Sequence, residues 1–391
     1  MSNKGIPTGW KKVQFGNVVK KINDKVQNRE EWTFERFIGG QHFDEGEIRI
    51  TRSAPIEGNE EVIGSAFHMR FKPGQVLYVT RNPRLRKGGM VDFEGVCSNV
   101  SFVMEADEKQ LLQSLLPFVI QTEDFVKHTC NNAHGSTNPF LNWKDIVSYE
   151  FLLPPIEEQK KISEVLWEIE NSIKDNTRYK TKLNLLKDKL VSDFFKENKD
   201  LINLKEASMI NKNSLSSKTP NDYEFSYLDI SSIIETGIIG DLKTYKYVDA
   251  PSRARRIINY QDVVISTVRP YLKGFVFIHE KIPDLIGSTG FAVLSAKEGT
   301  LPEYLWVFVL SKFFMRQAEQ SMIGSNYPAL NQKDIENFKI PKVNFDMQKA
   351  FVERILKIEN SLSLIKENMT SNKNLRNKLS NELLKGELRL K

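Results

Sequence analysis

The chain repeats one sequence pattern twice, and this duplication restricts its fold more than any other feature. Residues 135–146 align with residues 324–335 at an offset of 189 positions, and eight of these twelve residues are identical. The same offset relates the identical Ile-Glu-Asn-Ser segments that begin at Ile169 and Ile358. Since a repeated sequence is the signature of a repeated structural unit, we expect two copies of one unit, each of about 188 residues.

Both copies follow the same internal order, which predicts an α+β fold. Residues 76–80 and 263–267 are short β-rich runs at matching places, whereas residues 111–125 and 301–320 carry apolar residues at helical spacing. Each copy then reaches a Gly-Ser turn, the motif Leu-Asn-x-Lys-Asp-Ile and a long polar segment. We therefore expect two pseudo-repeated globular domains separated by two long helices.

A long helix is predicted after each globular part. Residues 157–195 contain no glycine or proline and begin with two glutamates, which favour a helix N-terminus. A heptad pattern fits this segment and its counterpart in the second copy, with polar interruptions. The expected a positions are Ile162, Ile169, Asn176, Leu183 and Leu190 in the first helix, and Phe351, Ile358, Ile365, Asn372 and Leu379 in the second. The expected d positions are Val165, Ser172, Tyr179, Leu186 and Asp193, and then Arg354, Ser361, Asn368, Leu375 and Glu382.

Two interpretations of these helices remain open. Each could cover the core of its own domain as an amphipathic surface helix. We favour a coiled coil between the two helices, because each is long and unbroken and each occurs once per copy. An asparagine at an a position specifies register and partner at some cost in stability, and each helix carries one, at Asn176 and Asn372.

Composition excludes several classes of function. The 391 residues include only two cysteines, without a CxxC pair, and five histidines without HxH or HxxxH spacing, so no metal site is expected. The longest apolar run, Tyr304–Leu310, is too short for a membrane span, and residues 1–10 do not form a signal segment. No Walker A or GxGxxG motif occurs, so no catalytic site and no cofactor are expected on this chain, which we expect to be cytoplasmic.

Basic residues gather in loops of both copies. Four cations and no acid lie between residues 81 and 87, directly after a predicted strand, which suits contacts with phosphates and guanine edges. The alternative is a solvated basic surface. The candidate DNA-binding cations are Arg81, Arg84, Arg86 and Lys87 in the first copy, and Arg253, Arg255, Arg256, Arg269 and Lys273 in the second.

The repeated Gly-Ser loops add polar candidates. An asparagine in such a loop has the donor and acceptor that adenine recognition needs. The alternative is a turn that only positions the next element, since the Leu-Asn-x-Lys-Asp-Ile motif that follows has structural character. The candidate DNA-binding residues here are Ser136 and Asn138 in the first loop, and Ser325, Asn326 and Tyr327 in the second.

Together these motifs resemble the specificity (S) subunit of type I restriction-modification systems. The resemblance rests on Leu-Pro-Pro-Ile-Glu-Glu-Gln-Lys-Lys-Ile at residues 153–162 following the motif at 135–146, on the opening Ile-Pro-Thr-Gly-Trp-Lys-Lys-Val at residues 6–13, and on the doubled layout. It covers the whole chain. The second junction, beginning at Pro341, departs from the pattern, because it lacks the second proline and the glutamate before its glutamine.

The resemblance implies a non-catalytic subunit that reads a split DNA sequence. Its expected parts are target-recognition domains at residues 1–153 and 200–340, and helical spacers at residues 154–199 and 341–391, which pair antiparallel. The implied partners are double-stranded DNA, two adenine methyltransferase (M) subunits and, in some assemblies, two restriction-translocase (R) subunits. S-adenosylmethionine and ATP are then expected on those partners and not on this chain.

Helix geometry is compatible with a spacer. A helix of about 39 residues spans about 58 Å, which corresponds to on the order of 15 base pairs of B-DNA. Two other classes of function stay open. One is a non-catalytic coiled-coil scaffold that binds proteins and not DNA, for which binding need not weaken steeply with salt. The other is a self-sufficient enzyme, which would methylate DNA without a partner.

Overall fold

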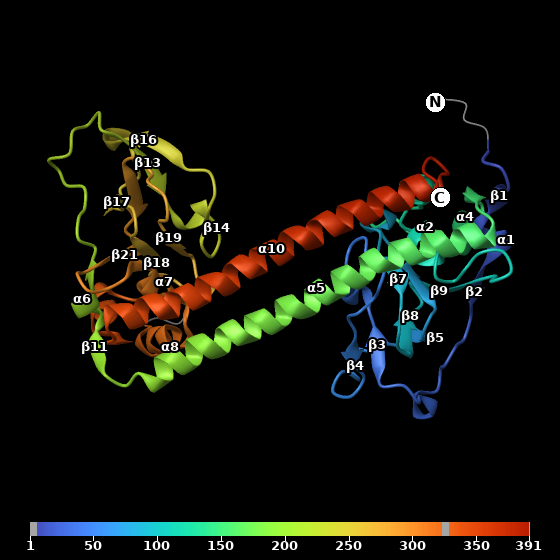
Figure 1. Cartoon of the computed structure of the whole chain (residues 1–391), viewed down its shortest axis with the longest axis horizontal. Helices are drawn as coiled ribbons and strands as arrows, with labels where there is room; N and C mark the ends of the chain where they lie inside the picture. Colours follow the sequence, from blue (N-terminus) through green and yellow to red (C-terminus); the bar gives the residue numbers. More distant parts are fainter. Residues whose placement is uncertain (1–5, 323–327, 391) are drawn as a thin grey trace. The chain divides into compact units, whose positions relative to one another are not determined.

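The computed structural model describes residues 6–322 and 328–390, and it has the α+β architecture expected from the sequence. The chain forms two compact units, which are considered separately. Unit 1 comprises Met1–Arg178 and Ile365–Lys391, and unit 2 comprises Tyr179–Leu364. Both unit boundaries fall inside the long helices α5 (Ile156–Glu197) and α10 (Phe345–Leu384), so each unit contains part of both helices (Figure 1).

Unit 1 is built on two four-stranded sheets. The order of the first sheet is β2-β9-β6-β7, and that of the second is β4-β3-β8-β5. Only the β3·β8 pair is parallel among the ladders of these sheets. A separate antiparallel pair joins β1 to β10, so the first strand meets the last strand before α5. The strands are β1 (Lys11–Gln14), β2 (Val19–Ile22), β3 (Arg36–Ile38), β4 (Ala54–Pro55), β5 (Phe67–Phe71), β6 (Val76–Val79), β7 (Gly88–Met90), β8 (Gly95–Ser98), β9 (Ser101–Ala106) and β10 (Glu150–Leu153).

Unit 2 repeats this topology strand for strand. Its sheets have the orders β12-β21-β18-β19 and β16-β13-β20-β17, again with one parallel pair, β13·β20, and β11 pairs with β22. The hairpin β14-β15 is an addition. The strands are β11 (Leu201–Asn203), β12 (Ser208–Ile210), β13 (Glu224–Leu228), β14 (Ile233–Glu235), β15 (Ile238–Ile239), β16 (Lys243–Lys246), β17 (Ala254–Ile257), β18 (Val263–Ser266), β19 (Phe275–Phe277), β20 (Leu285–Ser288), β21 (Phe291–Ala296) and β22 (Lys339–Pro341).

The short helices also correspond between the units. Unit 1 contains α1 (Phe15–Val18), α2 (Leu116–Val119), α3 (Glu123–Asn131), α4 (Trp143–Val147) and the 3-10 turns η1 (Arg29–Glu31), η2 (Gly40–His42) and η3 (Pro83–Leu85). Unit 2 contains α6 (Leu204–Ala207), α7 (Pro302–Leu310), α8 (Lys312–Ser321), α9 (Gln332–Asn337) and the turns η4 (Ile230–Ser232), η5 (Tyr247–Asp249) and η6 (Pro270–Leu272). The duplication predicted from short identical segments therefore extends through the whole fold.

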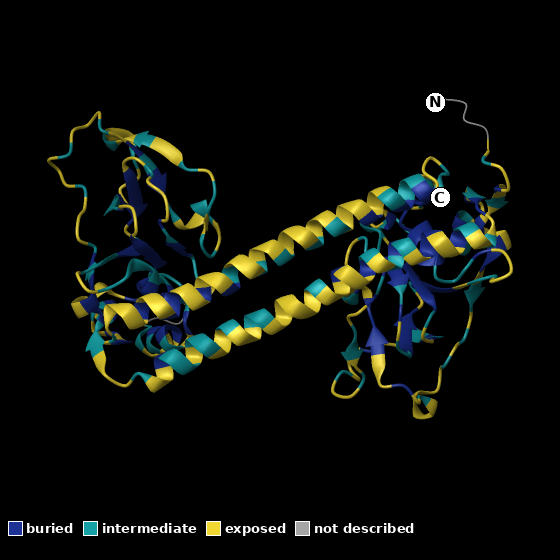
Figure 2. Ribbon diagram, in the orientation of Figure 1, coloured by how far each residue is buried: buried dark blue, intermediate teal, exposed yellow. Residues whose placement is uncertain are grey.

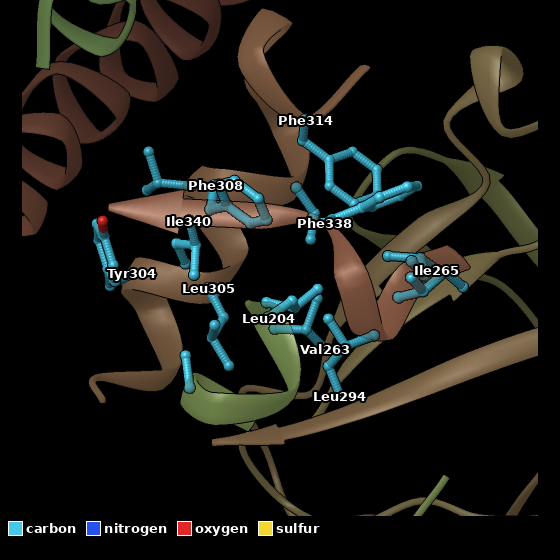
Figure 3. Close-up of a cluster of buried hydrophobic side chains, with 14 of the residues drawn as sticks. Leu204, Val263, Ile265, Leu294, Tyr304, Leu305, Phe308, Phe314, Phe338 and Ile340 are labelled. Atoms are coloured by element: carbon cyan, nitrogen blue, oxygen red, sulfur yellow. The ribbon is translucent and has the colours of Figure 1, made fainter. Parts of the chain in front are cut away.

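The ends of the long helices belong to the cores of the units. In unit 1, Ile162 and Leu166 of α5 and Leu383 of α10 are buried with the residues of β6 and α2. In unit 2, Phe195 and Phe351 join a core formed by α7 and the strands β18 and β22. Figure 3 shows this second cluster, in which α7 presents its side chains toward β22. Figure 2 shows that both long helices nevertheless keep an exposed face along their length.

Within each unit the two long helices run antiparallel. In unit 1, Glu170 and Ser172 of α5 contact Arg376 and Asn372 of α10, so the numbers fall along one helix as they rise along the other. In unit 2, Lys187 lies 3.6 Å from Glu359, and the rings of Phe194 and Phe351 stack with centroids 3.8 Å apart. Both interpretations of these helices thus describe part of the structure, because each helix covers a core and also contacts the other helix.

A buried glutamine attaches the start of each long helix to its unit. The Gln159 side chain accepts a hydrogen bond from the Leu112 amide at 2.9 Å and donates to the carbonyls of Gln110 at 2.7 Å and Pro154 at 2.9 Å. Gln348 makes the three equivalent hydrogen bonds, to Leu301, Gly299 and Val343. The glutamine shared by the two junctions is therefore a structural anchor, because its buried side chain satisfies three backbone groups at the start of the helix.

Two absences concern the described parts of the chain. No helix there is both long enough and apolar enough to cross a membrane. Residues 6–322 and 328–390 also contain no cluster of three or more histidine, cysteine or acidic side chains suited to a metal ion. Cys97 is buried and Cys130 is exposed, and both are free thiols.

Candidate nucleic-acid interface

A strained turn follows the strand β6 in unit 1, and the same turn follows β18 in unit 2. Asn82 and Arg86 flank η3 with φ of 50° and 49°, and Arg269 and Lys273 flank η6 with φ of 49° and 50°. A non-glycine residue in this left-handed region costs on the order of 1–3 kcal/mol, and such strain gathers at functional sites. The turn conformation is retained although its side chains differ between the units.

Backbone hydrogen bonds hold each turn against the segment before the Leu-Asn-x-Lys-Asp-Ile motif. In unit 1 the Asn82 amide donates to the Pro139 carbonyl at 2.8 Å. In unit 2 the Arg269 amide donates to the Pro328 carbonyl at 2.9 Å. The structure thus brings together the basic loop and the Gly-Ser loop of unit 1, which lie more than 50 residues apart in the sequence.

The motif itself fixes the end of the Gly-Ser loop. Asn142 and Asp145 form a capping box at the start of α4, and Asn331 and Asp334 form the same box at the start of α9. His134 lies 3.0 Å from the Asp145 carboxylate. Asp145 has a pKa below its usual value, because hydrogen bonds from the Asn142 amide and His134 outweigh the largest influence, which is burial and acts in the opposite direction. The Asn and Asp of the motif therefore have a structural role, because they cap the helix that follows the Gly-Ser loop.

Four of the candidate residues in unit 1 form one exposed surface. The Arg81 guanidinium lies over the Phe140 ring at 5.0 Å and donates to the Asn138 carbonyl at 3.4 Å. The side-chain amide of Asn82 donates to the side-chain oxygen of Asn138 at 3.0 Å. Arg84 and Ser136 are also exposed. This surface offers guanidinium and amide groups, which suit contacts with phosphates and base edges.

The other two cations of this loop bind within unit 1. Arg86 forms an ion pair with Glu123 at 2.6 Å, and the hydrogen bond from Arg86 lowers the pKa of the Glu123 carboxyl. The Lys87 ammonium donates to the Gly40 carbonyl at 2.9 Å. Arg86 and Lys87 therefore hold the loop in place, and Arg81 and Arg84 are the residues with exposed cationic groups.

The candidate cations of unit 2 lie on two different sheets. Arg255 and Arg256 belong to β17, the counterpart of β5, and Arg253 directly precedes that strand. Arg255 lies over the Tyr247 ring at 5.2 Å, and Arg256 donates to the Ser214 hydroxyl at 3.4 Å, while burial lowers the pKa of its guanidinium. Arg255 and Arg256 therefore lie on a strand and not in the loop after β18, and their contact with DNA stays a prediction.

Only Arg269 and Lys273 of this set belong to the repeated turn. The Lys273 ammonium donates to the Leu310 carbonyl at 3.4 Å. Between them, Tyr271 is 47% exposed and occupies the place that Arg84 has in unit 1. Ser325, Asn326 and Tyr327 lie outside the described residues. The two turns thus present different side chains on one backbone.

Sequence reasoning missed a hollow on unit 1 of about 960 Å³. Arg36, His42 and Arg52 line it beside three glutamates, and Arg52 forms an ion pair with Asp44 at 2.6 Å. Burial, the larger influence, and the charge of Arg52 both lower the pKa of His42. Arg36 belongs to β3, His42 ends the turn η2, and Arg52 precedes β4, so no sequence motif marks this hollow.

The ten expected a positions of the long helices are buried or half-buried. Ile162, Phe351 and Ile358 are buried, and the other seven are half-buried: Ile169, Asn176, Leu183, Leu190, Ile365, Asn372 and Leu379. The expected d positions are mostly exposed, including Tyr179 and Leu375. The remaining contact positions lie four residues after a and not three, as at Leu166, Ile173, Ile355 and Leu362. Asn372 donates to the Ser172 hydroxyl at 3.0 Å.

Comparison with known proteins places this architecture in a family. The family model for the type I restriction modification DNA specificity domain matches twice, at residues 7–185 and 194–372. The MjaVIII type I restriction enzyme specificity subunit of Methanocaldococcus jannaschii is 22% identical over 335 residues, which cover 76% of this chain and 75% of that protein.

Solved structures share the fold. The type I S subunit of M. genitalium matches with a TM-score of 0.60 at 14% identity, and the match covers 98% of both chains. A chain from a structural study of complex assembly and conformational transition of the type I R-M system has a TM-score of 0.60 at 17% identity, covering 98% of this chain and all of that one. The two family matches account for most of the sequence, and this chain belongs to the type I restriction modification DNA specificity domain family.

Proposed function

We propose that this chain is the DNA-recognition subunit of a type I restriction-modification complex, in which each globular domain reads one half of a bipartite target. The observation that carries the proposal is the strained turn after β6 and β18, which occurs twice with nearly equal φ angles and with different side chains at its exposed centre, Arg84 and Tyr271. Two readers on one scaffold need this combination, since phosphate contacts position a domain and the side chains at base edges specify the sequence.

The division of the chain follows from this function. Residues 1–153 and 200–340 serve as target-recognition domains, and residues 154–199 and 341–391 serve as spacers that also dock methyltransferase subunits. With 42 residues in α5, a helix rise of about 1.5 Å per residue corresponds to about 63 Å, or roughly 18 base pairs. The helices then set the unread gap between the two half-sites.

The chemistry belongs to partner subunits in this proposal. Two methyltransferase subunits supply S-adenosylmethionine and transfer its methyl group to adenine, and two restriction-translocase subunits that use ATP join in some assemblies. The complex works on double-stranded DNA in the cytoplasm. This chain contributes sequence discrimination and spacing but no catalytic residue.

The deciding experiment is to map methylated adenines in cells that carry this chain together with its methyltransferase. We expect a bipartite motif with a fixed gap. Arg84→Ala should relax one half-site and Tyr271→Ala the other, whereas Lys109→Ala, an exposed lysine away from both turns, should change neither. Loss of both half-sites through one substitution would contradict independent readers, and methylation by the purified chain alone would contradict a non-catalytic role.

Salt dependence separates this function from a protein-binding scaffold. DNA affinity of the reconstituted complex should fall steeply with salt, because phosphate contacts release counterions. An unchanged affinity across that range would favour the scaffold.

A further inference from the structure

Unit 2 contains a basic pocket that reaches one end of the turn η6, at Lys273, and the proposed DNA-reading function assigns no ligand to it. Its volume is about 780 Å³, and it lies between the C-terminal part of α5 and the helices α7 and α8. Two carboxylates, of Asp188 and Glu359, stand against six cations in the lining. These cations are Lys187, Lys196, Lys199, Lys273, Lys312 and Arg316.

Apolar side chains form part of this pocket. Phe195, which is buried, and Phe313, which is half-buried, stack with ring centroids 6.1 Å apart. Val307 and Leu310 of α7 also line it. The pocket thus combines an apolar wall with cationic groups, and its volume falls within the range of about 300–1,000 Å³ that is typical of small-molecule sites.

The equivalent place in unit 1 carries two carboxylates, and each of them pairs with a cation. Glu123 and Asp124 occupy the first turn of α3, where carboxylates are favoured. Glu123 pairs with Arg86 at 2.6 Å, and Asp124 pairs with Lys385 at 3.1 Å. Beside Asp124 and Lys385 unit 1 has a pocket of only about 190 Å³.

Unit 2 keeps the cations but has lost both carboxylates. Lys312 and Phe313 stand in the first turn of α8 where unit 1 has Glu123 and Asp124. Lys273 and Lys196 correspond to Arg86 and Lys385, and neither has a carboxylate partner among the residues that the structure describes. Of the ion pairs at this place, unit 2 retains Lys187–Glu359, the counterpart of Arg376–Glu170.

We propose that this pocket binds a small organic anion that carries at least two negative charges on an apolar body. The negative charges of this anion replace the two carboxylates that unit 1 has and unit 2 lacks, and they lie near Lys196, Lys273 and Lys312. The apolar body packs against Phe195 and Phe313. A DNA backbone fits less well, because a pocket with an apolar wall lacks the extended track that phosphates need.

Titration calorimetry on the full-length chain tests the site with defined probes. Adenosine 5′-monophosphate and naphthalene-1,5-disulfonate combine an aromatic body with two charges. Adenosine, which lacks the negative charges, and inorganic phosphate, which lacks the aromatic body, serve as control ligands. We expect at least one of the two aromatic dianions to bind with Kd below about 1 mM, and adenosine and phosphate to bind at least about tenfold more weakly. Binding should weaken with added salt.

Variants place the binding in this pocket. Lys312→Glu/Phe313→Asp restores the acidic pair of unit 1 and should weaken dianion binding at least about tenfold. Lys196→Gln, an exposed single change that leaves the core intact, should also weaken it. Lys218→Glu, an exposed lysine elsewhere in unit 2, is the control and should have no effect.

Three outcomes would overturn the proposal. They are failure of both dianions to bind below about 1 mM, equal affinity in Lys196→Gln and wild type, and binding of only a short DNA duplex or an acidic peptide. These outcomes are distinguishable from a failure of DNA target recognition, because that function is tested at Arg84 and Tyr271, which do not line this pocket.

Discussion

Glu170 of α5 and Arg376 of α10 form a buried ion pair, with side chains 6% and 5% exposed. The Arg376 guanidinium also donates to the Gly46 carbonyl at 2.8 Å, so one arginine ties both long helices to a loop of unit 1. A buried charge without its partner is costly, and removal of one member of such a pair destabilises by about 3–5 kcal/mol. We expect Arg376→Met to lower the free energy of urea unfolding by an amount of this order.

The same pair supplies its own controls. Glu170→Leu/Arg376→Met removes both charges and should recover most of the lost stability. Lys187→Met breaks the counterpart in unit 2, where the side chains of Lys187 and Glu359 are 28% and 37% exposed, and should cost at most about 1 kcal/mol. A loss in Lys187→Met as large as that in Arg376→Met would mean that burial does not govern these pairs.

The junction glutamine gives a second prediction. In Gln159→Leu the Leu112 amide and the carbonyls of Gln110 and Pro154 lose their partner inside the protein. An unsatisfied buried polar group costs about 1–3 kcal/mol, so we expect unit 1 to lose at least about 2 kcal/mol in stability.

The change should be followed by urea unfolding, with Lys160→Leu as the exposed neighbouring control. Gln348→Leu should produce a similar loss in unit 2, because the three hydrogen bonds there are equivalent. Wild-type stability of both glutamine variants would show that these hydrogen bonds do not anchor the helices.

The duplication was predictable because identity persists at residues that the backbone itself requires. The capping residues Asn142 and Asp145, and the buried Leu141 and Ile146 beside them, recur at the constant offset. The capping residues bind the free backbone groups at a helix end and the apolar residues fill the core. Both roles are the same in each copy, whichever DNA sequence the surface recognises. The α+β class followed from the β-rich runs and the helical spacing in each copy, and the two long helices followed from segments without glycine or proline.

Other features had no comparable signal. The strands β5 and β17 share no identical residues, so Arg253, Arg255 and Arg256 could not be placed by alignment. The heptad assignment placed the second contact position three residues after a, whereas the structure mostly has it four residues after a. Ile355, Leu362 and Leu383 indicated a broader apolar stripe in α10, but the polar residues Ser172 and Asn176 obscured the four-residue spacing in α5.

A third prediction concerns Glu47, whose backbone neighbour Gly46 accepts the hydrogen bond from Arg376. Burial raises the pKa of Glu47 to about 8, from a usual value of 4.5. Because this pKa is raised in the folded state, the Glu47 carboxyl adds to the free energy of unfolding in full below pH about 4.5. This contribution is lost as the pH rises through about 8.

Glu47→Gln cannot ionise and should therefore gain stability relative to wild type as the pH rises. Urea unfolding of both proteins at pH 5 and pH 9 measures this difference, which should reach at least about 1 kcal/mol after allowance for partial solvent screening. Glu45→Gln, at an exposed neighbour, is the control. Parallel stability profiles of wild type and Glu47→Gln would contradict the raised pKa.

A fourth prediction tests the proposed spacer. One added turn of about four residues in each long helix, near Tyr179 in α5 and Leu364 in α10, lengthens each helix by about 6 Å. It also rotates the following part by about 40°, and B-DNA turns by about 34° per base pair at about 3.4 Å rise. The translation and rotation both correspond to one or two base pairs, so the unread gap should grow by that amount with both half-sites unchanged. Mapping methylated adenines in cells measures the gap, and an insertion of the same residues into the exposed loop around Lys218 is the control. A gap of unaltered length in the helix variant would refute the spacer role.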